Sequence, residues 1–238
     1  MPSPNQTCYA CQVPLNLYST PELGELATQA AAGRQLRILS PPAALEVRGN
    51  REAESVQVLL WEDDYPGWIK VEDLKTLRPK PVPASPLGLT RAQISDRLPD
   101  VIAFAEAAMA QPNIYLWGGT LGPNYDCSGL VQAAFASVGV WLPRDSYQQE
   151  AFTEPVSWDA VQRGDLIFFG GDRTTHVALA LDRERYIHSS GKDQGRNGIG
   201  VDVLSEAGDT VSQAYFRQRR RAGRVMQSYR ATGEPFQC

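Results

Sequence analysis

The sequence predicts a small antiparallel β-barrel followed by an α+β domain with an antiparallel sheet. Short period-two apolar patterns fill the first 78 residues, spaced prolines follow, and an amphipathic helix then precedes three strand-like segments. A chain of 238 residues is long enough for two domains, each with its own core. We therefore expect a first domain at 1–78, a connector with a short helix at 79–97, and a second domain at 98–238.

The first segment alternates apolar and polar residues between turn-forming residues. The alternating apolar sets are Val13, Leu15 and Leu17, then Leu36 and Ile38, then Val56, Val58 and Leu60. Asp64–Gly67 predicts a turn that leads into a strand at 68–71. The stretch 25–32 contains good helix formers, but we interpret it as a strand and turn. Cys8 and Cys11 form a lone C-x-x-C pair, for which two buried thiols are a better interpretation than a zinc or redox site.

A proline-bearing connector separates the two predicted domains. Pro79, Pro81, Pro83 and Pro86 favour an extended chain. Beyond them, Thr90 predicts the cap of a short helix, and Pro99 predicts the first turn of the next one.

A second amphipathic helix carries the cysteine of interest. Its apolar residues recur at helical spacing: Leu130, Val131, Ala134, Phe135 and Val138. Asp126 has the chemistry of an N-cap, so Cys127 falls in the first helical turn. Free N–H groups and the helix dipole favour negative charge there, and we expect the pKa of this thiol to lie below its usual value of about 8.5.

Both histidines of the chain lie in strands predicted after that helix, at 165–169, 176–181 and 185–188. His176 begins the second strand, and alternation puts His188 on the same face as Tyr186 in the third. A thiol on a helix with imidazoles on the adjoining sheet is the arrangement of cysteine peptidases. From residue types alone, packing roles stay open, as does a zinc site at Cys127, His176 and His188, although no short ligand spacing supports zinc.

Composition narrows the function classes. The chain has 23 Lys and Arg against 27 Asp and Glu, a net charge of −4, so we do not expect a nucleic-acid partner. The cluster Arg217–Arg221 with Arg224 is interpreted as an exposed final strand. No apolar run reaches the roughly 20 residues of a membrane span. Met1–Gln12 lacks the features of a secretion signal, so a cytoplasmic location is expected if this is the native start.

Five motifs in the second domain resemble the NlpC-type cysteine peptidases, bacterial cell-wall hydrolases with a papain-like core. The similarity covers roughly residues 98–226, and the motifs appear in family order: Tyr115-Leu-Trp-Gly-Gly, Asp126-Cys-Ser-Gly-Leu-Val-Gln132, Leu142-Pro-Arg-Asp-Ser-Tyr-Gln148, Arg163-Gly-Asp-Leu-Ile-Phe-Phe169 and His176-Val-Ala. The resemblance implies Cys127 as nucleophile, His176 as general base and His188 as the residue that orients this base.

The resemblance also implies roles around the thiol. Tyr115 would lie beside it as an oxyanion donor, with a packed aromatic as the alternative. Asp126 would cap the helix, face a substrate ammonium, or do both. Ser128 and Ser146 are candidate polar residues of the substrate pocket. Arg144 is either substrate-facing or a structural ion-pair partner.

The first domain resembles bacterial SH3-like domains in Val13–Tyr18 with Pro21, and in Gly67–Leu74. In soluble two-domain relatives such a module closes one end of the cleft, and the enzyme cuts γ-D-glutamyl–diamino acid bonds of peptides with a free L-alanine. Tyr65 would then hold the substrate amine together with Asp126. Glu62 and Asp64 are weaker candidates, and a solvated turn is the alternative.

Taken together, the resemblance implies a cysteine endopeptidase for murein peptides of the L-Ala-γ-D-Glu-diaminopimelate type, active in peptide recycling and needing no metal or organic cofactor. Three alternatives stay open. They are a wall-bound hydrolase or amidase acting on intact peptidoglycan, an acyltransferase with a related thiol site, and a non-catalytic binding module. The diamino acid and the oligomeric state are not specified by the sequence.

Overall fold

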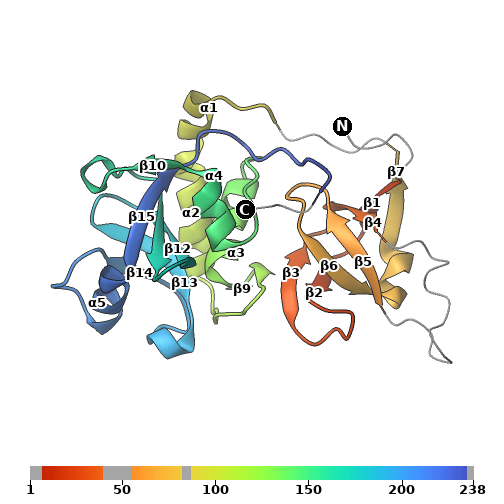
Figure 1. Ribbon diagram of the computed structural model, residues 1–238, viewed down its shortest axis with the longest axis horizontal. Coiled ribbons are helices and arrows are strands. Elements are labelled where there is room, and N and C mark those ends of the chain that lie inside the picture. Colours follow the sequence, from red (N-terminus) through yellow and green to blue (C-terminus); the bar gives the residue numbers. More distant parts are fainter. Residues whose placement is uncertain (1–6, 40–54, 82–86, 235–238) are drawn as a thin grey trace. The chain divides into compact units, whose positions relative to one another are not determined.

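A computed structural model describes residues 7–39, 55–81 and 87–234 (Figure 1). The chain forms two compact units. In its described part, the first unit contains the residues before 82 together with 230–234, and the second unit contains residues 87–229.

The first unit is built on one antiparallel sheet with the strand order β3-β2-β6-β5-β4-β1-β7. Its elements are β1 (Cys8–Cys11), β2 (Leu15–Tyr18), β3 (Leu26–Ala30), β4 (Gln35–Ile38), β5 (Ser55–Leu60), β6 (Pro66–Lys70), the 3-10 helix η2 (Val71–Thr76) and β7 (Leu77–Lys80). The all-β prediction is confirmed, and β3 shows that the strand interpretation of residues 25–32 was right.

The apolar residues that alternate along these strands form the core of the first unit. Its buried members are Cys11, Leu15, Leu17, Ala30, Leu36, Val56, Val58, Leu60 and Ile69. Cys8 and Cys11 are both buried and both free thiols, as expected for packing residues. Burial raises the pKa of Cys11 to about 11, which keeps this thiol neutral and unreactive.

The connector begins later than the sequence predicts. Leu77–Lys80 forms β7, which pairs with β1 at the edge of the sheet and places Pro79 opposite Tyr9. An edge strand tolerates proline because the missing N–H need not join a ladder. Pro83 and Pro86 lie outside the described residues. After them, Thr90 caps α1 (Arg91–Ser95) in a capping box with Gln93, as predicted.

Residues 230–234, near the end of the chain, belong to the first unit, which no sequence pattern predicts. Asp64, which is 1% exposed, accepts hydrogen bonds from Thr232 N (2.5 Å), Thr232 Oγ1 (3.1 Å) and Gly233 N (3.1 Å). The Arg37 guanidinium donates to the Gly233 carbonyl. Residues 230–234 are thus part of the packing of this unit, whereas the domain expected at 98–238 would have included them.

The second unit is α+β, as predicted, with a six-stranded antiparallel sheet in the order β10-β15-β11-β12-β13-β14. After α1 its elements are α2 (Leu98–Met109), β8 (Thr120–Leu121), β9 (Asn124–Tyr125), α3 (Cys127–Ala136), α4 (Ser146–Phe152), β10 (Glu154–Val156), η3 (Trp158–Ala160), β11 (Leu166–Gly170), β12 (Thr174–Ala180), β13 (Arg185–Ser190), η4 (Lys192–Gln194), β14 (Gly198–Val203), α5 (Thr210–Arg217) and β15 (Arg219–Arg224).

Helices cover both faces of this sheet (Figure 1). On one face, α2 and α3 pack on Leu166, Phe168, Val177, Leu179 and Ile187. The alternate residues of the same strands point the other way, where Ile167, Phe169, Ala178 and Tyr186 pack with Tyr215 of α5. Each fully buried Leu or Phe side chain stabilises the folded state by about 1.5–3 kcal/mol relative to an exposed one. The strand alternation therefore fixes which side chains face α3 and which face α5.

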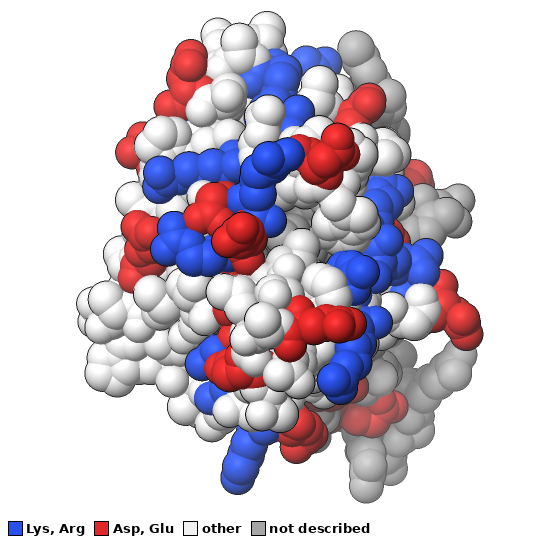
Figure 2. Space-filling view, turned by 90° about the vertical axis from the view of Figure 1, so that its left-hand side faces the viewer, with Lys and Arg blue, Asp and Glu red and all other residues white. Residues whose placement is uncertain are grey.

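Three arginines near the end of the chain have partners within the second unit, and their strand lies inside the sheet. β15 lies between β10 and β11. Arg220 pairs with Glu150, Arg224 pairs with Asp165, and Arg221 donates to the carbonyls of Glu150 and Thr153. Figure 2 shows cationic and anionic side chains interspersed on the face that it presents. Arg220, Arg221 and Arg224 of this cluster therefore have partners within the second unit, whereas Arg217 and Arg219 are exposed.

Candidate active site

Cys127 is the first residue of α3, and the carboxylate before it holds the helix end. Asp126 Oδ1 accepts from Gly129 N at 2.6 Å, the N-cap bond predicted from the sequence. Asp126 Oδ2 also accepts from Gly118 N at 2.9 Å. A side chain on Gly129 would lie 2.0 Å from the Gly119 carbonyl, so only glycine allows this close approach.

The thiol itself is buried. Cys127 is 6% exposed, and its sulfur is hydrogen-bonded to the backbone of Val177 and of Ser128. Burial, and next the negative charge of Asp126, raise the pKa of Cys127 to about 12, whereas the backbone bonds and Arg144 oppose the rise. The predicted drop in this pKa is therefore wrong, because desolvation outweighs the effect of the helix end.

A buried ion pair fixes the residues on both sides of the cysteine. Arg144 is 1% exposed and donates to Asp126 Oδ2 (2.5 Å), to Asp126 Oδ1 (3.1 Å) and to Ser128 Oγ (2.9 Å). Of the two alternatives for Arg144, the structure favours the ion-pair partner. Asp126 and Ser128 both accept hydrogen bonds from Arg144, and Asp126 also accepts from the helix end. These contacts give both side chains a structural role.

The two histidines meet on neighbouring strands. His176 Nε2 lies 2.8 Å from His188 Nδ1, and His188 Nε2 lies 2.7 Å from Asp202 Oδ2 on β14. All three side chains are buried. Val177, next to His176, shares a core with Cys127, and this places α3 beside β12. Within the described ranges, however, no hydrogen bond joins the Cys127 sulfur to the His176 ring.

Burial also controls the charge of the imidazoles. It lowers the pKa of His176 well below its usual value of about 6.5, and the neighbouring His188 adds to this effect. Burial lowers the pKa of His188 as well, although the Asp202 carboxylate opposes the shift. Burial therefore favours the neutral forms of the thiol and of both imidazoles at this site.

Tyr115 is half-buried and forms an isolated bridge with Tyr125, the residue that precedes Asp126. Burial, and then the charges of Cys127 and Asp126, raise the pKa of the Tyr115 hydroxyl. The hydroxyl therefore remains a hydrogen-bond donor throughout the working pH range.

Ser146 begins α4 and is buried. Its hydroxyl has no hydrogen-bond partner among the residues that the structure describes, so it is available to a ligand.

The candidates of the first unit have internal partners. Glu62 and Asp63 pair with the buried Arg34 at 3.2 and 2.8 Å, and Asp64 binds the returning chain end. The side chain of Tyr65 packs against the core of its own unit. The weaker candidates Glu62 and Asp64 thus have structural partners within their own unit.

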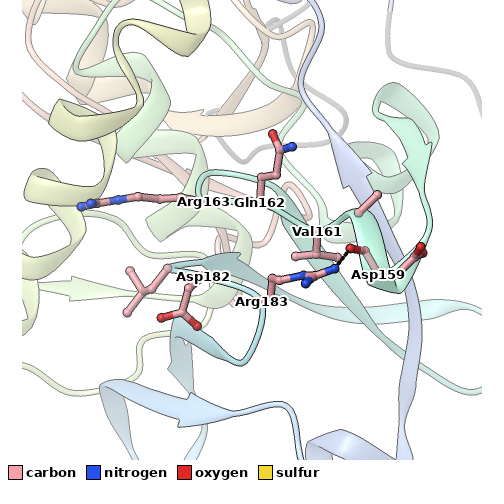
Figure 3. A pocket seen from close by; sticks show the side chains of 8 residues that line it. Asp159, Val161, Gln162, Arg163, Asp182 and Arg183 are labelled. Carbon is pink, nitrogen blue, oxygen red and sulfur yellow. Dashed lines mark hydrogen bonds between the residues drawn. The ribbon is translucent and has the colours of Figure 1, made fainter.

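No group of three or more His, Cys, Asp or Glu side chains in the described part of the chain is arranged to hold a metal ion. A shallow pocket of about 430 Å³ lies at η3 and the turn after β12, lined by charged residues such as Arg163, Asp182 and Arg183. In Figure 3 the Arg183 side chain reaches to the backbone carbonyl of Asp159. This pocket contains none of the predicted site residues.

Among the described helices, none has the length and apolarity to cross a membrane.

Two family profiles match the chain. Residues 17–74 match the bacterial dipeptidyl-peptidase Sh3 domain, and residues 112–221 match the NlpC/P60 family. The chain carries a bacterial SH3 domain and an NlpC/P60 domain. The NlpC/P60 match contains Tyr115, Cys127, His176 and His188, and so confirms the resemblance found in the sequence motifs.

Three curated relatives align with part of the chain. Dipeptidyl-peptidase 6 of Lysinibacillus sphaericus is 38% identical over 108 residues, which is 45% of this chain and 36% of the relative. The peptidoglycan endopeptidase RipB of Mycobacterium tuberculosis is 37% identical over 135 residues, 51% of this chain and 54% of the relative. The γ-D-glutamyl-L-lysine dipeptidyl-peptidase of Bacillus cereus is 39% identical over 79 residues, 32% of this chain and 24% of the relative. The chain thus matches between about a quarter and about half of their length.

The residues that sequence reasoning missed surround the histidines. Asp202 accepts from His188, Arg196 holds Asp202, and Tyr215 packs on both imidazole rings. One signal for Asp202 was present: it is the lone carboxylate between Val201 and Val203 in a period-two segment. No local pattern marks Arg196 or Tyr215.

Proposed function

We propose that the chain is a cysteine peptidase that hydrolyses the γ-D-glutamyl–diamino acid bond of murein-derived peptides with a free N-terminal L-alanine. The observation that carries the proposal is the position of Cys127, at the first turn of α3 and against the backbone beside His176. The NlpC/P60 match and the activities after which two of the relatives are named support the reaction class and the bond.

In the proposed reaction, Cys127 Sγ attacks the γ-carbonyl carbon of D-glutamate while its proton passes to His176. The neutral resting pair requires this transfer to accompany attack, and hydrogen bonds between catalytic groups commonly tighten only in the substrate complex. The backbone N–H of Cys127 and the Tyr115 hydroxyl would stabilise the oxyanion. His176 then returns the proton to the leaving amine, and water releases the acyl group from the sulfur by the reverse sequence.

Amine recognition is the finer part of the proposal. Because Arg144 already neutralises Asp126, we assign a polar contact of the substrate to Ser146, and a role for Tyr65 stays a prediction of the sequence. The role in peptide recycling and the cytoplasmic location stay predictions of the sequence.

Turnover of L-Ala-γ-D-Glu-diaminopimelate and of its N-acetylated form tests the function. We expect cleavage of the free peptide and loss of at least about 100-fold on acetylation. Cys127→Ala should abolish turnover, whereas Cys8→Ala, which changes a buried thiol of the SH3 domain, should retain it. Equal rates on both peptides would remove the free-amine requirement. Cleavage of intact peptidoglycan alone would favour a wall-bound hydrolase, the activity that the name of RipB suggests.

A further inference from the structure

Three side chains form a continuous hydrogen-bonded line across β12, β13 and β14. His188 pairs with Gly200 in the antiparallel register, so Asp202, two residues further along β14, lies diagonally beside it on the same face. The line runs from His176 Nε2 to His188 Nδ1 (2.8 Å) and from His188 Nε2 to Asp202 Oδ2 (2.7 Å). His188 and Asp202 are 0% and 2% exposed, so water does not replace these bonds.

The carboxylate at the end of this line is surrounded by donors. Arg196 donates to both oxygens of Asp202, with Nε at 3.0 Å from Oδ2, and Ser212 Oγ donates to Oδ1 at 3.0 Å. Burial alone would raise the pKa of Asp202, but the bonds from His188 and Arg196 hold it below its usual range. An ionised carboxylate can only accept hydrogen bonds. His188 must therefore carry its proton on Nε2.

The protonation of His188 at Nε2 also fixes the tautomer of the His176 ring. A neutral imidazole has one N–H and one lone pair. With Nε2 protonated, His188 presents the lone pair of Nδ1, so His176 must donate from its own Nε2. The Nδ1 of His176 is then left as a lone pair, and this nitrogen has no other hydrogen-bond partner among the described residues.

We propose that Asp202, clamped by Arg196 and Ser212, is a positioning residue that sets the tautomers of both histidines, so that His176 keeps the lone pair of Nδ1 free to accept the Cys127 proton. This inference rests on the proposed function for its consequence in catalysis. Its structural content, the location of two protons, does not depend on any activity.

The rings are also fixed against rotation. Tyr215 packs on His176 and His188 with centroid distances of 4.5 and 4.8 Å, and its hydroxyl bonds to Ser190 Oγ at 2.8 Å. Phe169 and Tyr186 pack on the remaining sides at 5.7 and 5.1 Å. A flip of either ring would break the line, so the tautomer and not the ring orientation is the variable that Asp202 controls.

The first test reads the protons directly. The chain contains only two histidines, so an untagged protein labelled with ¹⁵N-histidine gives only four ring-nitrogen signals in a long-range ¹H–¹⁵N spectrum. At pH 7.5 we expect both rings to show protonated Nε2 and unprotonated Nδ1. The other charged and titratable groups around the line are Arg196, Asp209, Tyr186 and Tyr215. Burial raises the pKa of both tyrosines, which keeps them neutral at this pH. A protonated Nδ1 on either histidine overturns the proposal without any variant.

The second test changes the acceptor. In Asp202→Asn, an amide NH₂ replaces one of the two oxygens that accept from His188, Arg196 and Ser212. Because this NH₂ can only donate, we expect at least one histidine to change tautomer. Peptide turnover should then show a kcat lower by about 100-fold or more, with KM within about threefold, because a general base contributes roughly 10²- to 10⁴-fold. The matched control is Asp209→Asn, since Asp209 also faces Arg196 (3.2 Å) but does not contact a histidine. Asparagine retains its helix cap, and we expect no change in either readout.

The outcomes separate the two proposals. Unchanged tautomers in folded Asp202→Asn overturn the positioning role, whatever the turnover. Changed tautomers with unchanged kcat overturn its importance for the reaction. If the wild-type chain cleaves no murein peptide, the proposed function fails, while the nitrogen spectrum still decides whether Asp202 sets the tautomers. If Asp202→Asn does not fold, the wild-type spectrum alone provides the test.

Discussion

Replacing Arg144 by methionine removes the positive partner of a buried carboxylate and tests the architecture around the thiol. Arg144 is 1% exposed and donates two hydrogen bonds to Asp126 and one to Ser128. Removing one partner of a buried pair costs about 3–5 kcal/mol, because it leaves the other charge uncompensated. The backbone N–H groups of Gly118 and Gly129 still hold Asp126 in the variant. We therefore expect the low end of this range, a loss of about 3 kcal/mol.

Hydrogen exchange of peptides from α3, followed by mass spectrometry in increasing urea, measures this loss in the NlpC/P60 domain alone. This local readout avoids treating a two-domain chain as one unfolding unit. Arg163→Met is the matched control, because Arg163 is exposed and its loss should change the free energy of opening by less than about 0.5 kcal/mol. A loss below about 1 kcal/mol for Arg144→Met, or an equal loss in the control, would refute the claim that this pair holds the helix end.

Four further predictions follow from other parts of the structure. Deleting residues 230–238 removes three hydrogen-bond donors to the buried Asp64 and should lower the stability of the SH3 domain by about 1–3 kcal/mol. We expect faster hydrogen exchange in β5 and β6. Unchanged protection there would contradict a packing role for this segment. The unfolded chain takes up protons at its histidines near pH 6.5, whereas burial lowers the pKa of His176 and of His188 in the folded chain, so stability should fall as the pH drops below about 6.5. The loss at pH 5.5 is about 1.4 kcal/mol for a histidine that stays neutral in the folded chain. Urea titrations should show this slope in the wild type and a smaller one in His188→Gln. Because the pKa of Cys127 is raised to about 12, its iodoacetamide alkylation should increase with every pH unit up to pH 9, and a plateau in acid would indicate a thiolate pair instead. Tyr115→Phe should lower kcat by about 10²-fold at similar KM if the hydroxyl supports the oxyanion, and an unchanged kcat would leave Tyr115 a packing residue.

Local patterns were sufficient for several features of this protein. The cap at Asp126 and the place of Cys127 in the first turn depend on a side chain bonding to a backbone N–H three residues away, an interaction that sequence spacing specifies directly. The strand at His176 and the shared face of His188 and Tyr186 follow from period-two alternation. The motifs then identified both domains, since five short segments in family order rarely occur together by chance.

Local patterns failed where the outcome depended on burial or on distant partners. The pKa of Cys127 was predicted from its helix position, but the thiol is buried against β12, and desolvation reverses the direction of the shift. Pro79 was expected to lie in the connector, but pairing of β7 with β1 made it part of an edge strand. Arg144 had two open roles, and only the packing around Asp126 favours one of them.

By itself, the sequence determined which helix holds the Cys127 thiol and which strands hold the two imidazoles, because these depend on interactions within a few residues. The tertiary structure decided that the His176–His188 line ends at Asp202, that Arg196 and Tyr215 support it, and that the chain end completes the SH3 domain. These features depend on strand register and on hydrogen bonds between groups that are 6 to 196 residues apart in the chain. No spacing rule encodes such partners, since the free energy of a buried polar contact is set by what surrounds it after folding.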